Sequence, residues 1–485
     1  MSPRLSETTL PQARAEAIRP AYDRAESRIG VVHFGPGAFH RAHQAFFFDR
    51  MLTRDPGLAI SVVSLRSDAV RAALEPQDGL YSLLEREAEP SLRVIGAIRE
   101  VLTAPGDPEA VFARLTDPMV RLVSATVTEK GYCLTPAGDL DTSHPDIRRD
   151  LADPARPSTL VGWLVEGLRR RRTAGLPGLT ALSCDNLSRN GDAWRRTALQ
   201  FARARGEADL ARWIEGEVAF PGSMVDSITP ATDEALRTEA EQALGLTDAW
   251  PVQRERFAQW VIGGDLGADA ATFAEAGVIL TGDVAGFERA KLRLLNGAHS
   301  TLAYVGLALG VATVAQAMAE PRLAAFVEAL MRREIAPTVA APAGLDLDGY
   351  IGEVLTRFRN PAIVHKLSQI AWDGSQKLPV RLLATLDDAL TQNLPIDRLA
   401  TGVAAWMLFV RRQAGAGEAL VDPLARDLVA VARTCTGEPA ADVARFLALD
   451  AVFPRRLAQS PRLRAALEAG YASLSSPNAR AEFAA

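Results

Sequence analysis

The chain has 485 residues, enough for two or more domains with cores of their own. Hydrophobic residues make up 48%, charged residues 23%, and the net charge is −5, values typical of globular proteins. The charges form no basic stripe of the kind that nucleic-acid binders need. Three cysteines cannot build a disulfide framework, and the N-terminus lacks the apolar core of a secretory signal. We therefore expect a cytoplasmic protein without a nucleic-acid partner.

The first half of the chain alternates short apolar runs with helical patterns. Strands are predicted over residues 28–34, 59–65, 92–98, 120–127 and 179–183, and a late strand over 277–283. Helices are predicted between them, over 38–52, 108–115 and 159–172. This alternation favours a mostly parallel sheet with helices on both faces.

After about residue 285 the pattern becomes helical, with predicted helices over 322–333, 381–390 and 399–412. We therefore predict an α/β domain over residues 1–284 and a mostly α-helical domain over 285–485. Residues 294–319 carry no charged side chain and are long enough to span a bilayer. Their Ala, Gly, Ser and Thr content favours a buried core helix, so no membrane partner is expected.

The first predicted strand runs into Gly35-Pro36-Gly37 and then into a predicted helix. Glycines let a backbone approach a pyrophosphate, and a helix N-terminus offers free N–H donors. His40 replaces the third glycine of the usual fingerprint, so a plain glycine turn stays an alternative. The context favours a Rossmann-like dinucleotide site. Its predicted contacts are Gly35, Gly37, Ala38, Phe39 and Arg41.

Asp68 follows the second predicted strand, where an acidic residue binds the adenosine ribose hydroxyls. It lies farther from Gly37 than the usual spacing of about 20 residues. The adjacent Arg66 suits a 2′-phosphate. NAD is the predicted cofactor, and NADP stays open.

The residues Lys291, Leu295 and His299 are four apart and share one face of a predicted helix, with Asn296 on a neighbouring stripe. Flanking leucines predict burial, which lowers a lysine pKa. A pKa of about 7–8 would make Lys291 a base for a hydroxyl proton. Lysine occurs only four times, against 50 arginines, which favours a functional role. A snorkelling lysine beside a core histidine is the alternative.

The segment KLRLLNGAHS (291–300) resembles the Lys-x-x-x-x-Asn-x-x-His signature of the mannitol dehydrogenase family of polyol-specific long-chain dehydrogenases. Further stretches resemble family motifs in the same order. They are GPGAFHRAHQAFFFDRM (35–51), TVTEKGYC (126–133), SCDNLSRNG (183–191), FPGSMVDSITP (220–230), FAQWVI (257–262) and DGSQKLP (373–379). The resemblance implies a Rossmann-like N-terminal domain, a helical C-terminal domain and metal-independent hydride transfer.

The resemblance also implies roles for single residues. Lys291 matches the general base, and Asn186 and Asn296 match the pair that stabilises the developing alkoxide. His299 matches the partner of a substrate hydroxyl, and Asp226 matches an acid that orients the site. Glu288 matches the proton relay to solvent, and Lys377 matches a substrate-positioning cation. The chain departs from the family at Ser227, where an arginine is usual, which puts a local ion pair in doubt.

The substrate class is the open point. TEKGYC and the stretch around Gln369 resemble the fructuronate reductase branch, which interconverts fructuronate and mannonate. Lys130 is placed to pair with a substrate carboxylate, although it also fits an exposed turn. The alternatives are mannitol, arabinitol or sorbitol as substrate, or a catalytically silent NAD-binding regulator. A zinc enzyme would need clustered Cys and His, and a short-chain dehydrogenase would need Tyr-x-x-x-Lys, which is absent.

Overall fold

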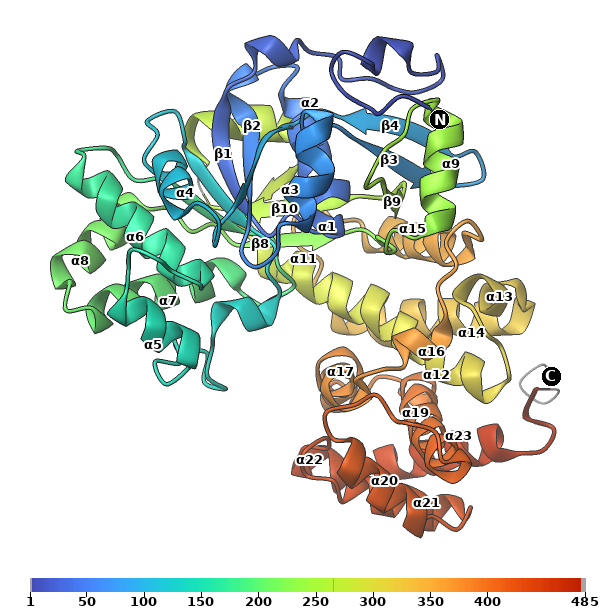
Figure 1. Cartoon of the computed structure of the whole chain (residues 1–485). Helices are drawn as coiled ribbons and strands as arrows, with labels where there is room; N and C mark the ends of the chain where they lie inside the picture. The colour runs from blue at the N-terminus through green and yellow to red at the C-terminus, as the bar shows by residue number, and fades with distance from the viewer. Residues whose placement is uncertain (1, 265, 481–485) are drawn as a thin grey trace. The chain divides into compact units, whose positions relative to one another are not determined.

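The computed structural model describes residues 2–264 and 266–480. The chain forms two compact units, Met1–Ala285 and Gly286–Ala485. In the N-terminal unit, five parallel strands form a sheet in the order β5-β2-β1-β6-β7, of which β1 and β2 are seen side by side in Figure 1. They are β1 (Ile29–Phe34), β2 (Ala59–Ser64), β5 (Ile98–Thr103), β6 (Leu122–Ala125) and β7 (Thr180–Ser183). The order reverses between β1 and β6, as in doubly wound nucleotide-binding sheets.

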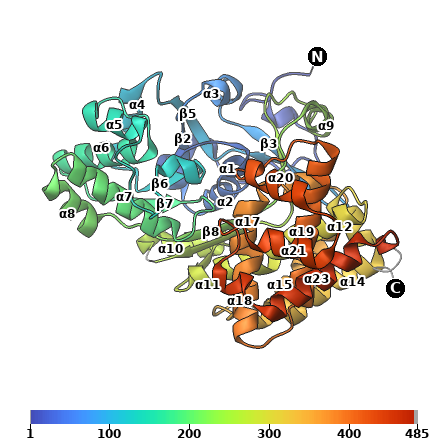
Figure 2. The same ribbon diagram turned by 90° about the horizontal axis from the view of Figure 1, so that it is seen from below.

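Successive residues of each strand point to opposite faces of the sheet. Helices cover both faces, so both sets of side chains are buried. Val32 and Phe34 pack with α4 (Pro108–Leu115), α6 (Leu160–Thr173) and α7 (Asn190–Ala204). Val31 packs on the other face with α2 (Gln44–Met51). In Figure 2, α5 (Pro145–Ala152), α6, α7 and α8 (Ala208–Glu217) gather on the β6–β7 side. The predicted α/β class is confirmed.

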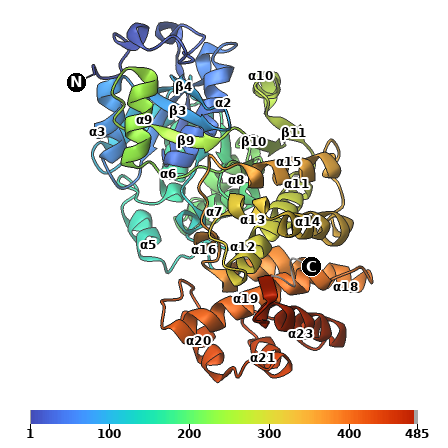
Figure 3. The same ribbon diagram turned by 90° about the vertical axis from the view of Figure 1, so that its right-hand side faces the viewer.

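Two smaller sheets complete this unit. One has the order β4-β3-β9, from β3 (Tyr81–Arg86), β4 (Ser91–Ile95) and β9 (Val252–Glu255). Helix α9 (Glu234–Leu244) lies against it (Figure 3). The other has the order β11-β10-β8, from β8 (Ser223–Asp226), β10 (Gln259–Gly263) and β11 (Ile279–Thr281). Short helices α3 (Ala69–Leu74) and α10 (Ala270–Glu275) fill the connections.

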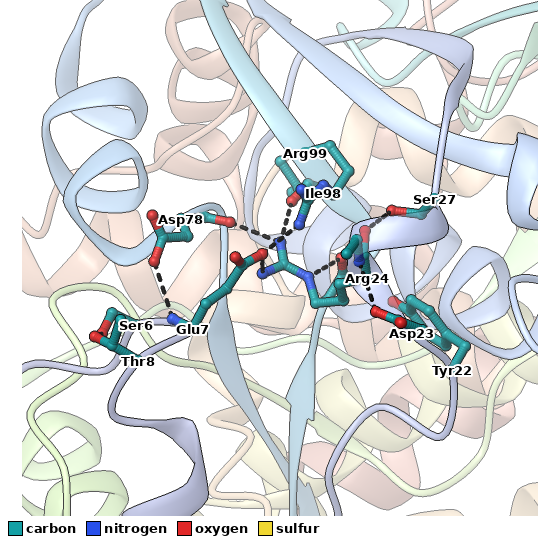
Figure 4. A network of polar contacts seen from close by, with 12 residues as sticks. Ser6, Glu7, Thr8, Tyr22, Asp23, Arg24, Ser27, Asp78, Ile98 and Arg99 are labelled. Atoms are coloured by element: carbon teal, nitrogen blue, oxygen red, sulfur yellow. Dashed lines mark hydrogen bonds and ion pairs between the residues drawn. The ribbon is translucent and has the colours of Figure 1, made fainter.

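The N-terminal segment is fastened to this unit by Arg24, which is only 7% exposed (Figure 4). Its guanidinium donates to the carbonyl oxygens of Asp78 at 2.6 Å and Ile98 at 3.1 Å, and it pairs with Glu7 at 2.5 Å. Arg99 also pairs with Glu7. A buried guanidinium is stable only when its donors are satisfied, so these contacts tie the segment to the edge strand β5.

The C-terminal unit is helical. Its centre is α19 (Asp397–Ala416), which packs against α12 (Ala298–Ala308) and α23 (Pro461–Ser475). The unit also contains α13 (Val314–Ala319), α14 (Pro321–Ala329), α15 (Leu347–Arg359), α16 (Leu367–Ile370), α17 (Gly374–Leu378), α18 (Ala384–Thr391), α20 (Ala425–Thr434), α21 (Pro439–Leu447) and α22 (Arg455–Ala458). Helix α11 (Val284–Ala290) leads into it. Its described residues include π-helical turns at Lys291–Gly297, Leu330–Ile335 and Pro379–Leu383.

Several predicted elements need correction. The strand expected over 92–98 is two strands in different sheets, because the chain turns at Gly96, whose N–H is held by buried Asp49 at 2.8 Å. The helix expected over 38–52 breaks at His43 into α1 (Ala38–Ala42) and α2. Residues 294–319 are buried as expected for much of their length, but Gly310, at φ +77°, separates α12 from α13. Within the described residues, no helix is both long and apolar enough to cross a bilayer.

Candidate active site

The glycine loop leaves the carboxyl end of β1, in the middle of the parallel sheet. Gly35 has φ +89°, and its N–H donates to Val63 O at 3.0 Å. A Cβ on Gly35 would lie 2.3 Å from Thr126 O, so only glycine fits there. Helix α1 begins at Ala38, and the first N–H groups of a helix have no intrahelical acceptor. Gly37 N donates to Gly35 O at 2.7 Å and closes the turn, so Ala38 and Phe39 bring the free backbone donors to this edge of the sheet.

The other two residues predicted to contact the cofactor lie in different surroundings. Asp68 is exposed at the carboxyl end of β2 and accepts a 2.6 Å hydrogen bond from Thr103 Oγ1. Arg41 is 1% exposed, and its Nη1 donates to Trp250 O at 2.7 Å, with the guanidinium over the Trp250 ring. Burial lowers the pKa of Arg41 to about 10. The Arg41 guanidinium is held in the interior of the unit and its backbone N–H donates to Gly37 O at 3.2 Å, so a contact of Arg41 with the cofactor stays a prediction.

Beneath the glycine loop lie two stacked histidines, of which the sequence singled out only His40. The rings of His33 and His40 are 3.4 Å apart, and both side chains are fully buried. His33 shares hydrogen bonds with Ser124 Oγ at 2.8 Å and Thr126 Oγ1 at 3.0 Å. Burial lowers the pKa of His33 to about 3 and that of His40 well below its ordinary value. Both rings are therefore neutral near pH 7.

This pair predicts acid-sensitive stability. The unfolded chain takes up protons on these histidines below about pH 6.5, whereas the folded chain does not, so the free energy of unfolding falls as pH drops. Each histidine adds a slope of about 1.4 kcal/mol per pH unit. We expect His40→Phe, which keeps a ring on His33, to remove that much slope between pH 6 and 5 in urea unfolding. An unchanged slope would mean that His40 is charged in the folded protein.

The carboxyl ends of β6 and β7 are joined by Asp185, which is 8% exposed. Its carboxylate accepts from Thr128 N at 2.7 Å, Val127 N at 3.1 Å and Tyr132 Oη at 2.9 Å. Burial raises the pKa of Asp185, and these three hydrogen bonds oppose the rise. Thr128 has φ +68° and ψ 165°, a region almost reserved for glycine, at a strain of about 1–3 kcal/mol.

The sequence-predicted residues of the N-terminal unit surround these strand ends. Asn186 follows Asp185 and is exposed, and Lys130 is exposed on the loop after β6. Asp226 ends β8 and is 5% exposed. Asn190 is 1% exposed, accepts from Ser223 N at 2.9 Å and donates to Ser223 O at 2.9 Å. Asn190 therefore joins β8 to the end of β7. This structural role was not predicted from its motif.

In the C-terminal unit, the catalytic signature forms a π-helical turn, not the α-helix that was expected. In an α-helix, residue i+5 lies about 140° around the axis from residue i. A π-turn closes i→i+5 hydrogen bonds, which bring residue i+5 closer to the face of residue i than an α-helix does. The π-turn Lys291–Gly297 therefore brings Asn296 towards the face of the helix that carries Lys291. Lys291 is 8% exposed, so the predicted burial of its side chain is confirmed.

His299 lies one turn beyond Asn296, in α12, and is 9% exposed. Its ring stacks on Phe358 at 5.1 Å and meets His365 edge-on at 4.8 Å. Burial, followed by His365 and then the nearby cations, holds the pKa of His299 well below its ordinary value. Its Nε2 has no hydrogen-bond partner within residues 2–264 and 266–480. A neutral imidazole with an open ring nitrogen can bind a hydroxyl.

Three cations lie near His299, namely Arg381, Arg357 and Lys377, and the sequence identified the last of them. Lys377 is half-buried, and its Nζ donates to Ile370 O at 3.3 Å. Burial and then Arg381 lower the pKa of Lys377. Arg381 donates to Ser300 Oγ at 3.1 Å, and its pKa is lowered by burial. No motif marked Arg381, because the π-turn that places it, Pro379–Leu383, has no sequence signature.

The remaining predicted residues are more accessible. Gln369 is exposed in α16, and Glu288 is half-buried in α11, one helical turn before Lys291. Across the described chain, no group of three His, Cys, Asp or Glu side chains is arranged to hold a metal ion.

Comparison with known proteins identifies the family. The mannitol dehydrogenase Rossmann-domain model matches residues 29–271, and the mannitol dehydrogenase C-terminal-domain model matches 283–475. D-mannonate oxidoreductase of Escherichia coli (strain K12) is 39% identical over 98% of this chain and 99% of its own. A substrate-free D-sorbitol dehydrogenase has a TM-score of 0.91 at 34% identity, covering 99% of this chain and 100% of that one. Pseudomonas fluorescens mannitol 2-dehydrogenase, in ternary complex with NAD and D-mannitol, has a TM-score of 0.82 at 35% identity, covering 99% of each chain. The resemblance seen in the motifs is thus confirmed, and the chain is an oxidoreductase that belongs to the mannitol dehydrogenase family.

Proposed function

We propose that this chain interconverts a secondary alcohol and a ketone of a sugar acid, with Lys291 as general base. The observation that carries the proposal is the π-turn Lys291–Gly297, which brings Asn296 towards the face of a buried lysine, while His299 follows one turn later. A water-shielded amine beside an amide donor and a neutral imidazole is a set that can remove a hydroxyl proton and hold the oxygen left behind.

Each residue then has a defined task. Lys291 accepts the hydroxyl proton, and Asn296 donates an N–H to the oxygen as its charge grows. Asn186, in the N-terminal unit, matches the second amide of the family's oxygen-binding pair. The open Nε2 of His299 binds a substrate hydroxyl. Glu288 lies one helical turn before Lys291 and takes the proton from Lys291 towards solvent. Asp226 orients the site.

The N-terminal unit fits a nicotinamide dinucleotide, which supplies the hydride acceptor when bound. Gly35 lets the turn pack closely against Thr126 O, Gly37 closes the turn through its N–H to Gly35 O at 2.7 Å, and Ala38 and Phe39 offer backbone donors for a pyrophosphate. Asp68 lies where the adenosine ribose binds in such sheets. NAD is the preferred cofactor, and the exposed Arg66 leaves NADP as the alternative. The P. fluorescens relative, whose structure holds NAD, supports the choice.

We infer a substrate that carries a carboxylate, with D-fructuronate and D-mannonate as the pair. Lys377 and Arg381 place two cations close to His299, and Lys130 adds an exposed one in the N-terminal unit. Cations bound to a carboxylate form the stronger class of hydrogen bond. The E. coli D-mannonate oxidoreductase supports this assignment. The alternative is D-mannitol and D-fructose, or arabinitol or sorbitol, on the same machinery.

A direct comparison of ketones tests the substrate class. With NADH in excess, we expect kcat/KM for D-fructuronate to exceed that for D-fructose by at least about 10-fold, the equivalent of one good charge pair. Equal or faster turnover of D-fructose would overturn the sugar-acid assignment and favour the polyol alternative. Tight NADH binding without turnover of any sugar ketone would instead favour a silent NAD-binding regulator.

A further inference from the structure

Asp185 holds the loop of residues 126–133 in a strained conformation. We propose that this makes Asp185 a positioning residue for the reaction, one that fixes Thr128 so that the loop keeps its place beside the glycine turn and Asn186. This inference rests on the proposed dehydrogenase function.

The strain lies in the backbone of Thr128. Its φ of +68° and ψ of 165° fall where almost only glycine is found, and a β-branched residue is among the least suited to it. The positive-φ position is occupied by Thr128, although the same loop contains a glycine three residues later, at Gly131. Such conformations persist only where the surroundings enforce them, and they cluster at functional sites.

The carboxylate of Asp185 enforces the strained conformation of Thr128. One carboxylate accepts three donors: Thr128 N at 2.7 Å, Val127 N at 3.1 Å and Tyr132 Oη at 2.9 Å. A carboxylate only accepts hydrogen bonds, whereas an amide of the same shape presents an NH₂ to one of these donors. Asp185→Asn therefore loosens the loop without creating a cavity.

The position of the Asp185–Thr128 contact indicates a role in the reaction and not only in folding. Thr126, next to the strained turn, donates from Oγ1 to Gly35 O at 2.7 Å. Asp185 lies two residues after the end of β7, and the next residue is Asn186. In open parallel sheets, ligands bind at the carboxyl ends of strands where the order reverses, here between β1 and β6. The strained loop lies at that edge, so Asp185 acts on the part of the site that meets ligand.

The chain offers a matched control in Asp150, another buried aspartate. Its carboxylate accepts from two consecutive backbone N–H groups, Ser158 N at 2.8 Å and Thr159 N at 2.8 Å. Thr159 has an ordinary extended backbone, at φ −101° and ψ 153°. Asp150 therefore repeats the contact without the strain. Asp150→Asn is expected to lower the melting temperature while leaving kcat/KM within about twofold.

The test compares Asp185→Asn alone with its combinations with Thr128→Gly and Thr128→Val, using ketone reduction by NADH. We expect Asp185→Asn to lower kcat/KM by at least about 10-fold and to change the Kd for NADH by less than about threefold, because only the loop is displaced. Thr128→Gly in the Asp185→Asn background should recover part of the loss, because glycine adopts this conformation unaided. Thr128→Val, which keeps the branched Cβ, should recover none.

Two results would overturn the proposal: wild-type kcat/KM in Asp185→Asn, or equal recovery by glycine and valine. Failure of the proposed function would look different, because the wild-type chain itself would then turn over no sugar ketone. In that case, amide hydrogen exchange at Val127 and Thr128 still decides whether Asp185 holds the loop. Exchange that is at least about 10-fold faster in Asp185→Asn would support the contact, and unchanged exchange would refute it.

Discussion

Replacing Lys291 by alanine is expected to lower kcat by about 10²- to 10⁴-fold, the usual effect of removing a positioned general base. The Kd for NADH should stay within about twofold, because the lysine acts on the substrate hydroxyl and not on the dinucleotide. Lys291 is 8% exposed on the π-turn Lys291–Gly297, so bulk water is poorly placed to replace the lost amine. Stopped-flow reduction under single-turnover conditions, with NADH titration alongside, measures both quantities.

Two further variants separate the chemistry from the charge. Lys291→Arg keeps a cation that cannot deprotonate, so it should be as slow as the alanine variant. Lys366→Ala removes one of the chain's three other lysines, an exposed one in the same unit, and should leave kcat unchanged. If Lys291→Ala turns over substrate at the wild-type rate, another group is the base and the mechanism proposed here is wrong.

Much of the parallel sheet could be predicted from the sequence, and the reason is its burial. Strands β1, β2, β6 and β7 are covered on both faces, so they read as continuous apolar runs. Strand β9 was missed because it carries Arg254, which is 1% exposed and pairs with Glu85 of β3. A buried ion pair between strands makes both partners look like surface residues, and no local pattern reveals that they satisfy each other.

The candidate site could be predicted in its residues but not in its geometry. Lys291, Asn296 and His299 were found from their spacing and motif, yet that spacing was assigned to an α-helix. The π-turn depends on packing from elsewhere in the chain, because a Cβ on Gly297 would lie 2.9 Å from Arg381 O of a second π-turn. The strain at Thr128 and the contacts of Asp185 depend likewise on residues far apart in sequence.

Gly35→Ala is the second change for which we expect a large effect. The new Cβ would lie 2.3 Å from Thr126 O, and the backbone at φ +89° suits glycine alone. The loop must therefore shift away from the β6 end, at an expected loss of about 1–3 kcal/mol in the free energy of unfolding. Since the same loop offers the backbone donors for a pyrophosphate, we also expect the Kd for NADH to rise at least about 10-fold.

Gly37→Ala is the matched control, because it separates loop shape from ligand contact. Gly37 has φ −68°, and its added Cβ would meet nothing closer than Gly35 O at 4.0 Å, so the melting temperature should not change. A rise in the Kd for NADH in this variant would then come from the methyl group blocking a close approach of the dinucleotide backbone. Calorimetric NADH titration of both variants decides the matter. Wild-type affinity in Gly35→Ala would show that the turn after β1 does not hold the cofactor, whatever Lys291 does to the substrate.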